Sequence, residues 1–447
     1  MANAIWEIEE LRELDRRRSL IRIPDQLDVP LTPRVRHLID TPEFHRLTRI
    51  SQLGLVSLVY PAAHHTRFEH SLGVYRMALL FLRRLAHDPR FTEAVEAPDA
   101  EIFIAAALLH DLGHWPFCHP IEDMDLPGVP EHELFANSFI LEGEIAELLR
   151  DEWQINPRDV VALLSEAPVG RAARLLQSML SGPIDIDKMD YLYRDSLHAG
   201  VPYGSNFDQP RLIGSLCVNQ EGDGLAITEK GRTAAEMMVF ARYVMFSEVY
   251  WHHAVRAATA MLQRAFYLLY QQLDLDLLFR MTEQEMIQAL LAVAGKGAAG
   301  ELLAGLFGPV RQLYKRVAQY SFLEQRELYT RLARRPYPWL VRLSEEFALL
   351  ASRHLGRRIA PHQILWDAPP THLEVQFQVP VYYSRQDTYR MLGEVSPVVH
   401  TLARRQFDDY VKRVRLFAHP EVAHHLASYD GLEHLVEEAI AQADSNA

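Results

Sequence analysis

The stretch that most constrains this chain is residues 102–119, which reads IFIAAALLHDLGHWPFCH. Its apolar first half predicts a buried helix, and Gly113 predicts that the chain turns soon after the helix ends. His110 and Asp111 therefore present an imidazole and a carboxylate at the end of that helix. Such a pair suits a borderline or hard divalent metal ion, although a single histidine there is more often a core or capping residue. A metal site requires further ligands from elsewhere in the chain.

The chain as a whole is expected to be mainly α-helical. Apolar residues recur at helical spacing over residues 69–86, 132–149 and 232–272. The pattern changes at 212–228, where two short strand-like runs flank Gly222-Asp223-Gly224 and predict a β-hairpin.

Strand-like segments return near the C-terminus, at 372–383 and 411–419, on either side of a predicted helix. They predict a small α/β lobe. We expect four parts: an N-terminal extension at 1–30, a main helical domain at 31–273, a helical subdomain at 274–365 and the small α/β lobe at 366–447.

Composition excludes several classes of protein. The chain has 447 residues and a formal net charge of −13, which argues against bulk attraction to nucleic acid. No apolar run is long enough to cross a bilayer, and the charged N-terminal stretch lacks the apolar core of an export signal. Two cysteines, Cys118 and Cys217, are too few for a disulfide framework. We therefore expect a cytoplasmic protein without a membrane partner, and nucleic acid is not an expected partner.

Histidine and acidic residues gather in four segments: HTRFEHSLG, LLHDLGHWPFCH, EHELF and IDIDKMDYLYRD. His70 lies 40 residues before the histidine of the HD pair, and Asp187 lies 76 residues after its aspartate. The order H…HD…D on separate helices fits a metal site with open positions for water and a phosphate oxygen. Asp185 and Asp190 are alternatives to Asp187, and a structural salt-bridge cluster is the alternative to a metal site.

These segments resemble the HD phosphohydrolase superfamily, specifically its deoxynucleoside triphosphate triphosphohydrolases, which include the vertebrate antiviral enzyme with an added SAM domain. RFEHSLGV, HDLGHWPFCH, DIDKMDYLYRD and ARYVMFSEVYWH stand in the family's order. The resemblance implies an HD-domain helical core at 31–273 and hydrolysis of dNTPs to deoxynucleoside and inorganic triphosphate. It also implies a divalent metal (Fe, Mn, Zn, Ni or Mg) held by His70, His110, Asp111 and Asp187.

The resemblance further implies which residues line the reacting phosphate. Histidine is the side chain best able to donate a proton near neutral pH, and His119 is our first choice for the acid at the leaving oxygen. The acidic residues would orient a histidine or a water, and ordinary loop or capping roles are the alternative. The implied catalytic residues are His114, His119, Glu122, His132 and Glu133.

Substrate contacts follow from the same resemblance. A triphosphate requires several cations, among which arginine binds phosphate oxygens in pairs. The implied phosphate contacts are Arg67, Lys188, Tyr191, Arg194 and Arg242. The implied sugar and base contacts are Gln52, Leu53, Asp195, Tyr250 and His252. Gln52 and Asp195 would bind the 3′-hydroxyl, and Tyr250 would stack under the sugar. A core aromatic role is the alternative for Tyr250, and a surface charge or an ion pair with Asp195 is the alternative for Arg194.

The resemblance bears on partners as well. IPDQLDVP stands where the family has a DPxHG-like activator segment, and His45 and Thr48 replace polar family residues near Asp40. These differences argue against activation by GTP or a dNTP. A nucleotide activator is therefore an alternative and not an expectation. Relatives are often tetramers, so we expect a homo-oligomer. The alternative functions are an HD phosphohydrolase for a nucleoside monophosphate, a cyclic nucleotide or GTP, and a nucleotide-sensing or nucleic-acid-binding HD protein with little catalysis.

Overall fold

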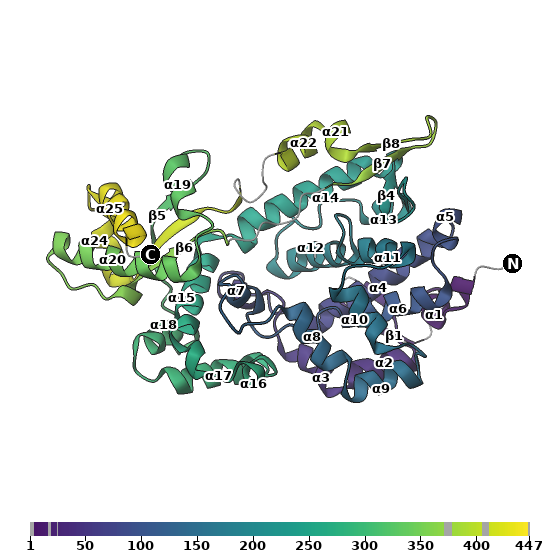
Figure 1. Ribbon diagram of the computed structural model, residues 1–447, viewed down its shortest axis with the longest axis horizontal. Helices are drawn as coiled ribbons and strands as arrows, with labels where there is room; N and C mark the ends of the chain where they lie inside the picture. The colour runs from purple at the N-terminus through teal and green to yellow at the C-terminus, as the bar shows by residue number, and fades with distance from the viewer. Residues whose placement is uncertain (1–3, 17–18, 25, 371–377, 405–410, 446–447) are drawn as a thin grey trace.

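The computed structural model describes residues 4–16, 19–24, 26–370, 378–404 and 411–445 (Figure 1). The expected class is confirmed, because the chain is mainly helical with a short β-hairpin and small sheets. The predicted strand at 372–383 lies partly outside the described residues. Among the described helices, none is both long and apolar enough to cross a membrane.

The N-terminal part is a short helix followed by a two-stranded antiparallel sheet. Buried Glu10 joins it to the main domain, because its carboxylate accepts hydrogen bonds from Thr32 Oγ1 at 2.7 Å and from Arg34 Nε at 2.8 Å. The elements are η1 (Ala4–Glu7), α1 (Glu9–Arg16), β1 (Leu20–Ile23) and β2 (Gln26–Pro30).

The main helical domain follows. The single helix predicted at 132–149 is two helices, because Gly143 adopts a positive φ of 69° and turns the chain between them. The elements are α2 (Pro33–Asp40), α3 (Pro42–His45), η2 (Arg46–Arg49), η3 (Gly54–Leu58), α4 (Arg67–Leu85), α5 (Pro89–Thr92), α6 (Ala97–Leu109), α7 (Cys118–Glu122), α8 (His132–Ile140), α9 (Gly143–Asp151), α10 (Pro157–Ser165), α11 (Arg171–Ser181) and α12 (Ile186–Ala199).

Three of these helices position the candidate site. Helix α4 packs against both α6 and α12. The Thr66 side chain caps the start of α4 by accepting from Glu69 N, and the Asp185 side chain caps α12 by accepting from Lys188 N. The first turns of α4 and α12 and the last turn of α6 are therefore well-defined helix ends.

A hairpin and a broken helix come next. The hairpin is confirmed, but the prediction of one helix over 232–272 is wrong in the middle. The last turn of α14 widens into a π-helix, and the His252 ring then caps a new helix by accepting from Ala254 N. The elements are α13 (Gln209–Gly214), β3 (Leu216–Val218), β4 (Leu225–Thr228), η4 (Glu229–Gly231), α14 (Arg232–Met245), the π-helix η5 (Phe246–Tyr250), α15 (His253–Leu269) and η6 (Tyr270–Gln272).

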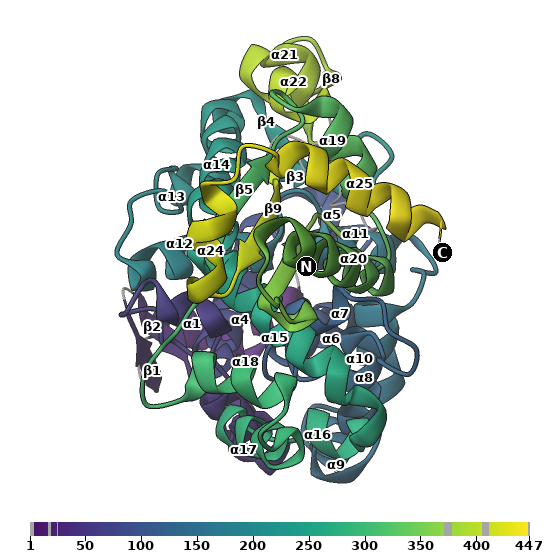
Figure 2. The ribbon, with the colours of Figure 1, turned by 90° about the vertical axis from the view of Figure 1, so that its left-hand side faces the viewer.

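The C-terminal third contributes strands to two different sheets. Strand β5 lies in the segment predicted to be helical, and it joins an antiparallel sheet of order β5-β9-β6. Strands β7 and β8 instead extend the hairpin, because β7 pairs parallel to β4 with Ile227 opposite Val381. Helix α24 lies beside β5 and β9, and α25 packs against α20 (Figure 2).

The bounds of these elements are α16 (Leu275–Phe279), α17 (Glu283–Ala294), α18 (Ala298–Phe307), β5 (Lys315–Tyr320), α19 (Arg326–Leu332), α20 (Tyr337–Leu355), η7 (Pro361–Gln363), β6 (Ile364–Asp367), β7 (Pro380–Tyr383), β8 (Thr388–Met391), α21 (Leu392–Val395), α22 (Pro397–Arg404), β9 (Val414–Ala418), α24 (Pro420–Ala427) and α25 (Leu432–Ser445).

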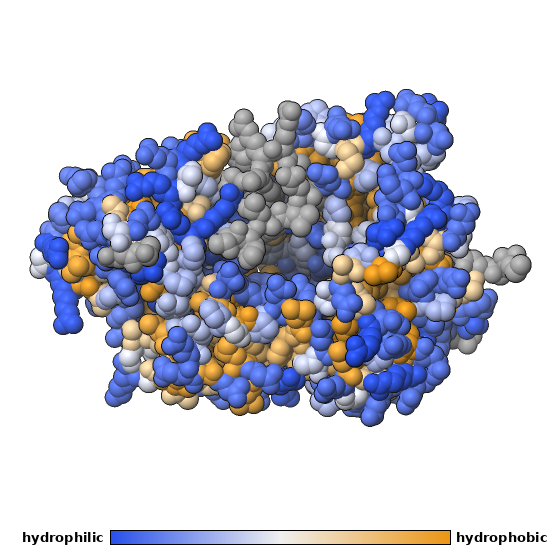
Figure 3. Space-filling model, in the orientation of Figure 1, coloured by the Kyte–Doolittle hydropathy of each residue, from blue (hydrophilic) through white to orange (hydrophobic). Residues whose placement is uncertain are grey.

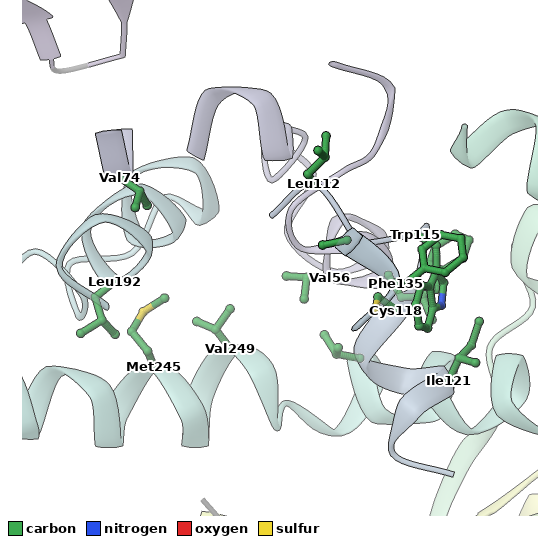
Figure 4. Close-up of a cluster of buried hydrophobic side chains, with 14 of the residues drawn as sticks. Val56, Val74, Leu112, Trp115, Cys118, Ile121, Phe135, Leu192, Met245 and Val249 are labelled. Atoms are coloured by element: carbon green, nitrogen blue, oxygen red, sulfur yellow. The ribbon is translucent and has the colours of Figure 1, made fainter. Parts of the chain in front are cut away.

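Packing in the apolar core holds the helices of the candidate site together. Figure 4 shows Val74, Leu192 and Met245, which bring α4, α12 and α14 together. Further along, the buried Trp115 ring stacks on Phe279 with ring centroids 4.1 Å apart, which fixes the loop after the HD pair. The outer face in Figure 3 is mainly hydrophilic, with apolar residues in small patches.

Candidate metal centre and neighbouring polar clusters

Three side chains from three helices converge at one point. His70 lies in the first turn of α4, His110 caps the end of α6, and Asp187 lies in the first turn of α12. His70 Nε2 is 3.3 Å from His110 Nε2 and 3.0 Å from Asp187 Oδ1. His110 Nε2 is 3.8 Å from the same oxygen. Three of the four predicted metal ligands are thus brought together.

The outer ring nitrogens determine where the lone pairs point. His110 Nδ1 is 2.9 Å from the carbonyl oxygen of Ala107, which only accepts, so Nδ1 carries the proton. His70 Nδ1 is 2.8 Å from Asp190 Oδ2, and an ionised carboxylate also only accepts. His70 Nε2, His110 Nε2 and the Asp187 carboxylate then face one another, which requires a cation at this point, either a proton on His70 Nε2 or a metal ion that replaces it. These residues therefore fit a divalent metal with nitrogen and oxygen ligands.

The electrostatics of the same residues also favour positive charge at this point. Burial lowers the pKa of His70, but hydrogen bonds to Asp187 and Asp190 outweigh burial and raise that pKa to about 10. Burial raises the pKa of Asp187, but the hydrogen bond from His70 outweighs it and the pKa is lowered. The aspartate is therefore ionised at neutral pH, as a metal ligand must be.

Asp111, the fourth predicted ligand, lies beside this group and also contacts Arg67 and His114. Its Oδ2 accepts from Arg67 Nη1 at 2.8 Å, and its Oδ1 is 3.0 Å from His114 Nδ1 and 3.5 Å from His110 Nε2. Burial raises the pKa of Asp111, but Arg67 and the two histidines outweigh it and hold the pKa well below its usual range. Its role as a ligand stays a prediction.

The five predicted catalytic residues form a second cluster on and beside α7 and α8. His132 is held by Glu122, whose Oε1 accepts from the His132 backbone at 2.7 Å and lies 2.9 Å from Nδ1. His119 Nδ1 is 3.6 Å from Glu122 Oε2, and Glu133 Oε1 is 3.3 Å from His132 Nε2. The His114 ring lies against both other histidines.

The second cluster is a group of rings in edge-on and tilted contact rather than a convergent set of ligands. Nitrogens of His114, His119 and His132 lie within 4.8 Å of one another, so proximity alone would allow a metal. Two imidazoles that bind one ion at about 2 Å keep their ring centres about 5 Å apart. His70 and His110 meet that requirement at 5.1 Å, whereas His114 and His132 are 3.9 Å apart. The first cluster is therefore the better metal site.

Protonation differs among the histidines of this cluster. Burial, together with the Arg67 cation, holds the pKa of His114 well below its usual range, so this ring is neutral. Burial lowers the pKa of His132, but hydrogen bonding to Glu122 outweighs it and the pKa is raised. Burial raises the pKa of Glu122, but hydrogen bonds from His119 and His132 outweigh burial and lower the pKa overall. This carboxyl is therefore ionised. The Glu122 carboxylate lies beside the imidazoles of His119 and His132, and such an arrangement can transfer a proton.

Among the predicted sugar and base contacts, Tyr250 meets Asp195, which lies on the same helix as Asp187. Asp195 Oδ2 accepts from the Tyr250 hydroxyl at 2.5 Å. Gln52 lies where the backbone of residues 50–52 pairs with that of 65–67, and its Oε1 is buried without a hydrogen-bond partner among the described residues. Leu53 is partly buried against the core, whereas the His252 ring is used to cap α15.

The predicted phosphate contacts are held by nearby acids. Arg67 donates to Asp111, and Lys188 Nζ is paired with Asp185 Oδ2 and donates to the carbonyl of Gly182 at 3.2 Å. Arg194 is buried, with Nε and Nη2 donating to Asp190 at 2.8 and 2.7 Å and Nη1 donating to Glu69 at 2.8 Å. All three donor nitrogens of Arg194 thus have carboxylate partners. The ion-pair alternative for Arg194 is therefore observed, with Asp190 and Glu69 as the acids in place of Asp195.

Two contacts place the remaining predicted residues. The Arg242 guanidinium lies over the Phe246 ring, 5.4 Å from its centroid. The Tyr191 ring meets the Tyr250 ring edge-on at 6.5 Å. Their contact with a phosphate stays a prediction.

Sequence reasoning did not single out several residues that the structure shows in the site. Glu69, His65 and His198 all take part in its hydrogen bonds, and Arg46 donates to the carbonyls of Leu112 and His114 at 2.8 and 3.0 Å. Spacing on α12 is a usable signal for His198, which lies eleven residues after Asp187 and shares its helix face. No local pattern distinguishes Arg46 from a surface arginine.

A separate basic cavity lies at the other side of α15. Its volume is about 500 Å³, and its cationic or titratable lining residues are His253, Arg311, Lys315 and Arg316. Burial, followed by the His252 ring and nearby arginines, lowers the pKa of His253. The cavity thus favours an anion.

Fold and site together define the class of protein. Residues 67–195 match the HD domain family, and residues 207–429 match the family described as the HD associated region. This is an HD-domain protein with an HD-associated region, and HD domains bind divalent metals.

Curated relatives refine the class. An uncharacterised protein of Bacillus subtilis is 38% identical over 230 residues, which cover 51% of this chain and 50% of that protein. The deoxynucleoside triphosphate triphosphohydrolase SAMHD1 of Gallus gallus is 27% identical over 290 residues, covering 58% of this chain and 47% of that enzyme. The chain thus spans about half the length of the curated relatives it matches.

A solved structure matches over a longer range. The crystal structure of a hypothetical protein from Aquifex aeolicus superposes with a TM-score of 0.70 and 28% identity. The match covers 90% of this chain and 97% of that protein, so the arrangement of the C-terminal third is also shared.

Proposed function

We propose that this protein hydrolyses deoxynucleoside triphosphates, in a metal-dependent reaction, to deoxynucleoside and inorganic triphosphate. One observation carries the metal requirement: the Nε2 lone pairs of His70 and His110 face the Asp187 carboxylate. The similarity to a deoxynucleoside triphosphate triphosphohydrolase supports the substrate class. The coarser conclusion, a metal-dependent phosphohydrolase, rests on the HD domain itself.

The reaction divides between the metal site and the second cluster. A bound divalent metal would lower the pKa of a water and polarise a phosphate oxygen. Attack of water on the α-phosphorus forms one phosphorus–oxygen bond and breaks the bond to O5′, which leaves as the deoxynucleoside hydroxyl after taking a proton. His119 has a side chain that is 61% exposed and lies next to Glu122, so it is placed to donate that proton. His132 sits between Glu122 and Glu133 and orients them.

The remaining residues hold the substrate. Arg67, Lys188 and Arg242 neutralise the triphosphate, and the acidic partners of Arg67 and Lys188 would exchange for phosphate oxygens. Arg194, with its carboxylate partners, supports the metal side from behind. Gln52, Asp195 and Tyr250 bind the sugar.

The experiment is product analysis with each dNTP and Mn²⁺ or Mg²⁺. We expect release of tripolyphosphate, and we expect Asp187→Ala to lower the rate by more than about 100-fold, because loss of metal-site residues removes the metal. Exposed Asp15, which pairs with Arg83 on the surface, supplies the matched control Asp15→Ala. Full activity of Asp187→Ala would refute the site, and release of orthophosphate or pyrophosphate instead would favour a different nucleotide reaction.

We also propose that this protein forms a homo-oligomer. The basic cavity at Arg311 and Lys315 would bind an anionic effector such as a nucleotide. Light scattering with and without GTP or a dNTP separates the cases. A constant monomer mass would refute assembly, and an unchanged oligomer would refute an assembly-promoting activator.

A further inference from the structure

One face of α12 carries a continuous series of polar side chains. The spacing of three or four residues places them on one side of the helix, facing α4. The series runs from the metal end to the sugar end. Its members are Asp187, Asp190, Tyr191, Arg194, Asp195 and His198.

His65 meets this series at the sugar end. Its side chain is fully buried, and Nε2 is 2.9 Å from Asp195 Oδ1. Because a carboxylate only accepts, Nε2 carries the proton. Tyr250 donates to the other oxygen at 2.5 Å, and burial, reinforced by Asp195, raises the pKa of its phenol well above the usual value, so the phenol remains a donor. Asp195 is therefore held at both oxygens.

The His65 ring is itself held on both sides. Its backbone carbonyl accepts from Gln52 N at 2.9 Å, which ties it to the segment that carries the predicted 3′-hydroxyl contact. Its ring stacks on His198, with centroids 4.3 Å apart and planes 13° apart. His198 Nε2 in turn is 2.9 Å from Glu69 Oε1, which also accepts from Arg194. These contacts leave the ring little freedom to rotate.

Two buried polar atoms in this region have no partner among the described residues. They are Gln52 Oε1 and His65 Nδ1, and neither residue is on the surface. Buried polar atoms are nearly always hydrogen-bonded, so unpaired ones mark a place where another polar group binds. With the Gln52 amide turned so that Nε2 takes the place of Oε1, its N–H donates to a sugar hydroxyl whose own proton is donated to Asp195.

We propose that His65 is a positioning residue for hydroxyl recognition: it holds Asp195 so that the carboxylate accepts from the 3′-hydroxyl of the substrate. The inference rests on the proposed dNTP substrate and names a further residue of the same site. A carboxylate held by Tyr250 alone rotates about its Cβ–Cγ bond, whereas one held at both oxygens keeps a free lone pair aimed at the sugar. His198 contributes by keeping the His65 ring in place.

The test compares a dNTP with the matching 2′,3′-dideoxynucleoside triphosphate, which lacks the 3′-hydroxyl. In the wild type we expect kcat/KM to be at least about 100-fold higher for the dNTP, because the dideoxy analogue leaves buried polar groups unpaired. His65→Phe keeps the stacked ring but removes the donor, and we expect it to reduce that ratio by about 10-fold, mainly through a higher KM for the dNTP. His65→Gln, which keeps an N–H donor at a similar reach, should recover most of the ratio.

A purely structural role for His65 would lower kcat/KM for both substrates equally and leave the ratio unchanged. That result overturns the proposal, as does a wild-type enzyme that turns over the two substrates equally. Thermal melting checks that the variants fold; if His65→Phe does not, His65→Asn, whose side chain is too short to reach Asp195, replaces it with the same expected loss. Absence of tripolyphosphate release from wild-type protein with any dNTP refutes the proposed function instead, and with it the basis of this inference.

Discussion

The neighbours of His70 determine the orientation and the protonation of its ring. Its Nδ1 faces Asp190 and its Nε2 faces Asp187 and His110, so each ring nitrogen has a carboxylate beside it, and a metal would displace the proton on Nε2. The same contacts raise its pKa to about 10, which means that a proton and a metal compete for one atom.

This competition predicts a pH dependence of stability. In the metal-free protein, the folded-state pKa of His70 is about 10 and lies above the unfolded value of about 6.5. Protonation therefore stabilises the fold fully below pH 6.5, and this stabilisation is lost as the pH rises toward 10. We expect the free energy of unfolding, measured with urea in EDTA, to fall more steeply over pH 7–10 in the wild type than in His70→Gln. Parallel curves for the two proteins would contradict the prediction.

At the scale of elements, the crossing of α4 and α12 decides whether the site can form. Gly73 lies at this crossing, and a Cβ there would collide with Asp190 Oδ1 and Arg194 Nη2. The absence of a side chain thus lets the Asp190–Arg194 pair fit against α4 and bind His70 from behind. Gly113 has a similar place in the loop after the HD pair, where a Cβ would collide with the His132 carbonyl oxygen.

Gly73→Ala tests the crossing. We expect it to destabilise the fold by about 1–3 kcal/mol through overpacking, and to weaken metal binding because Asp190 must move. Gly214→Ala is the matched control, because a Cβ there meets no atom within 4 Å. Thermal melting and metal content measured by mass spectrometry report the two effects. Equal metal content and equal melting temperatures for Gly73→Ala and the wild type would contradict the close approach.

At the scale of the whole molecule, the C-terminal third is joined to the HD core by buried charges as well as by strands. Arg256 of α15 donates to Asp367 of β6, with Nη2 2.6 Å and Nε 3.1 Å from Oδ1. Its guanidinium also lies 4.0 Å from the centroid of the Trp251 ring. Burial lowers the pKa of Arg415, which faces the same carboxylate, to about 10. One aspartate thus balances two buried arginines.

Asp367→Asn tests this junction. The neutral amide leaves two buried cations without a counter-charge, so we expect a loss of about 3 kcal/mol in the free energy of unfolding. Asp15→Asn removes an exposed ion pair instead, and we expect it to cost less than about 1 kcal/mol. Urea denaturation followed by circular dichroism measures both. A loss for Asp367→Asn no larger than that of the control would show that the junction depends on the strands alone.

Much of the fold and the metal site was predictable because its signals are local. Helical spacing, the Gly222–Gly224 turn and the HD pair each lie within a few residues, and three predicted ligands do converge. The helix predicted over 232–272 was wrong in the middle, where the π-helix ends at Tyr250, whose hydroxyl donates to Asp195, 55 residues away and outside any local pattern. The strand at 315–320 was missed because its partners, β6 and β9, come later in the chain.

The sequence by itself determined which chemical groups are present and the order in which they occur: the HD pair at the end of a buried helix, and the histidines and aspartates around it. Only the tertiary structure decided which atoms of those groups face one another. Asp190 and Arg194 pair behind His70, and His65 reaches Asp195, because α4, α12 and the segment at 50–52 pack together. Ring orientation and proton position depend on such contacts between distant residues, and no local pattern encodes them.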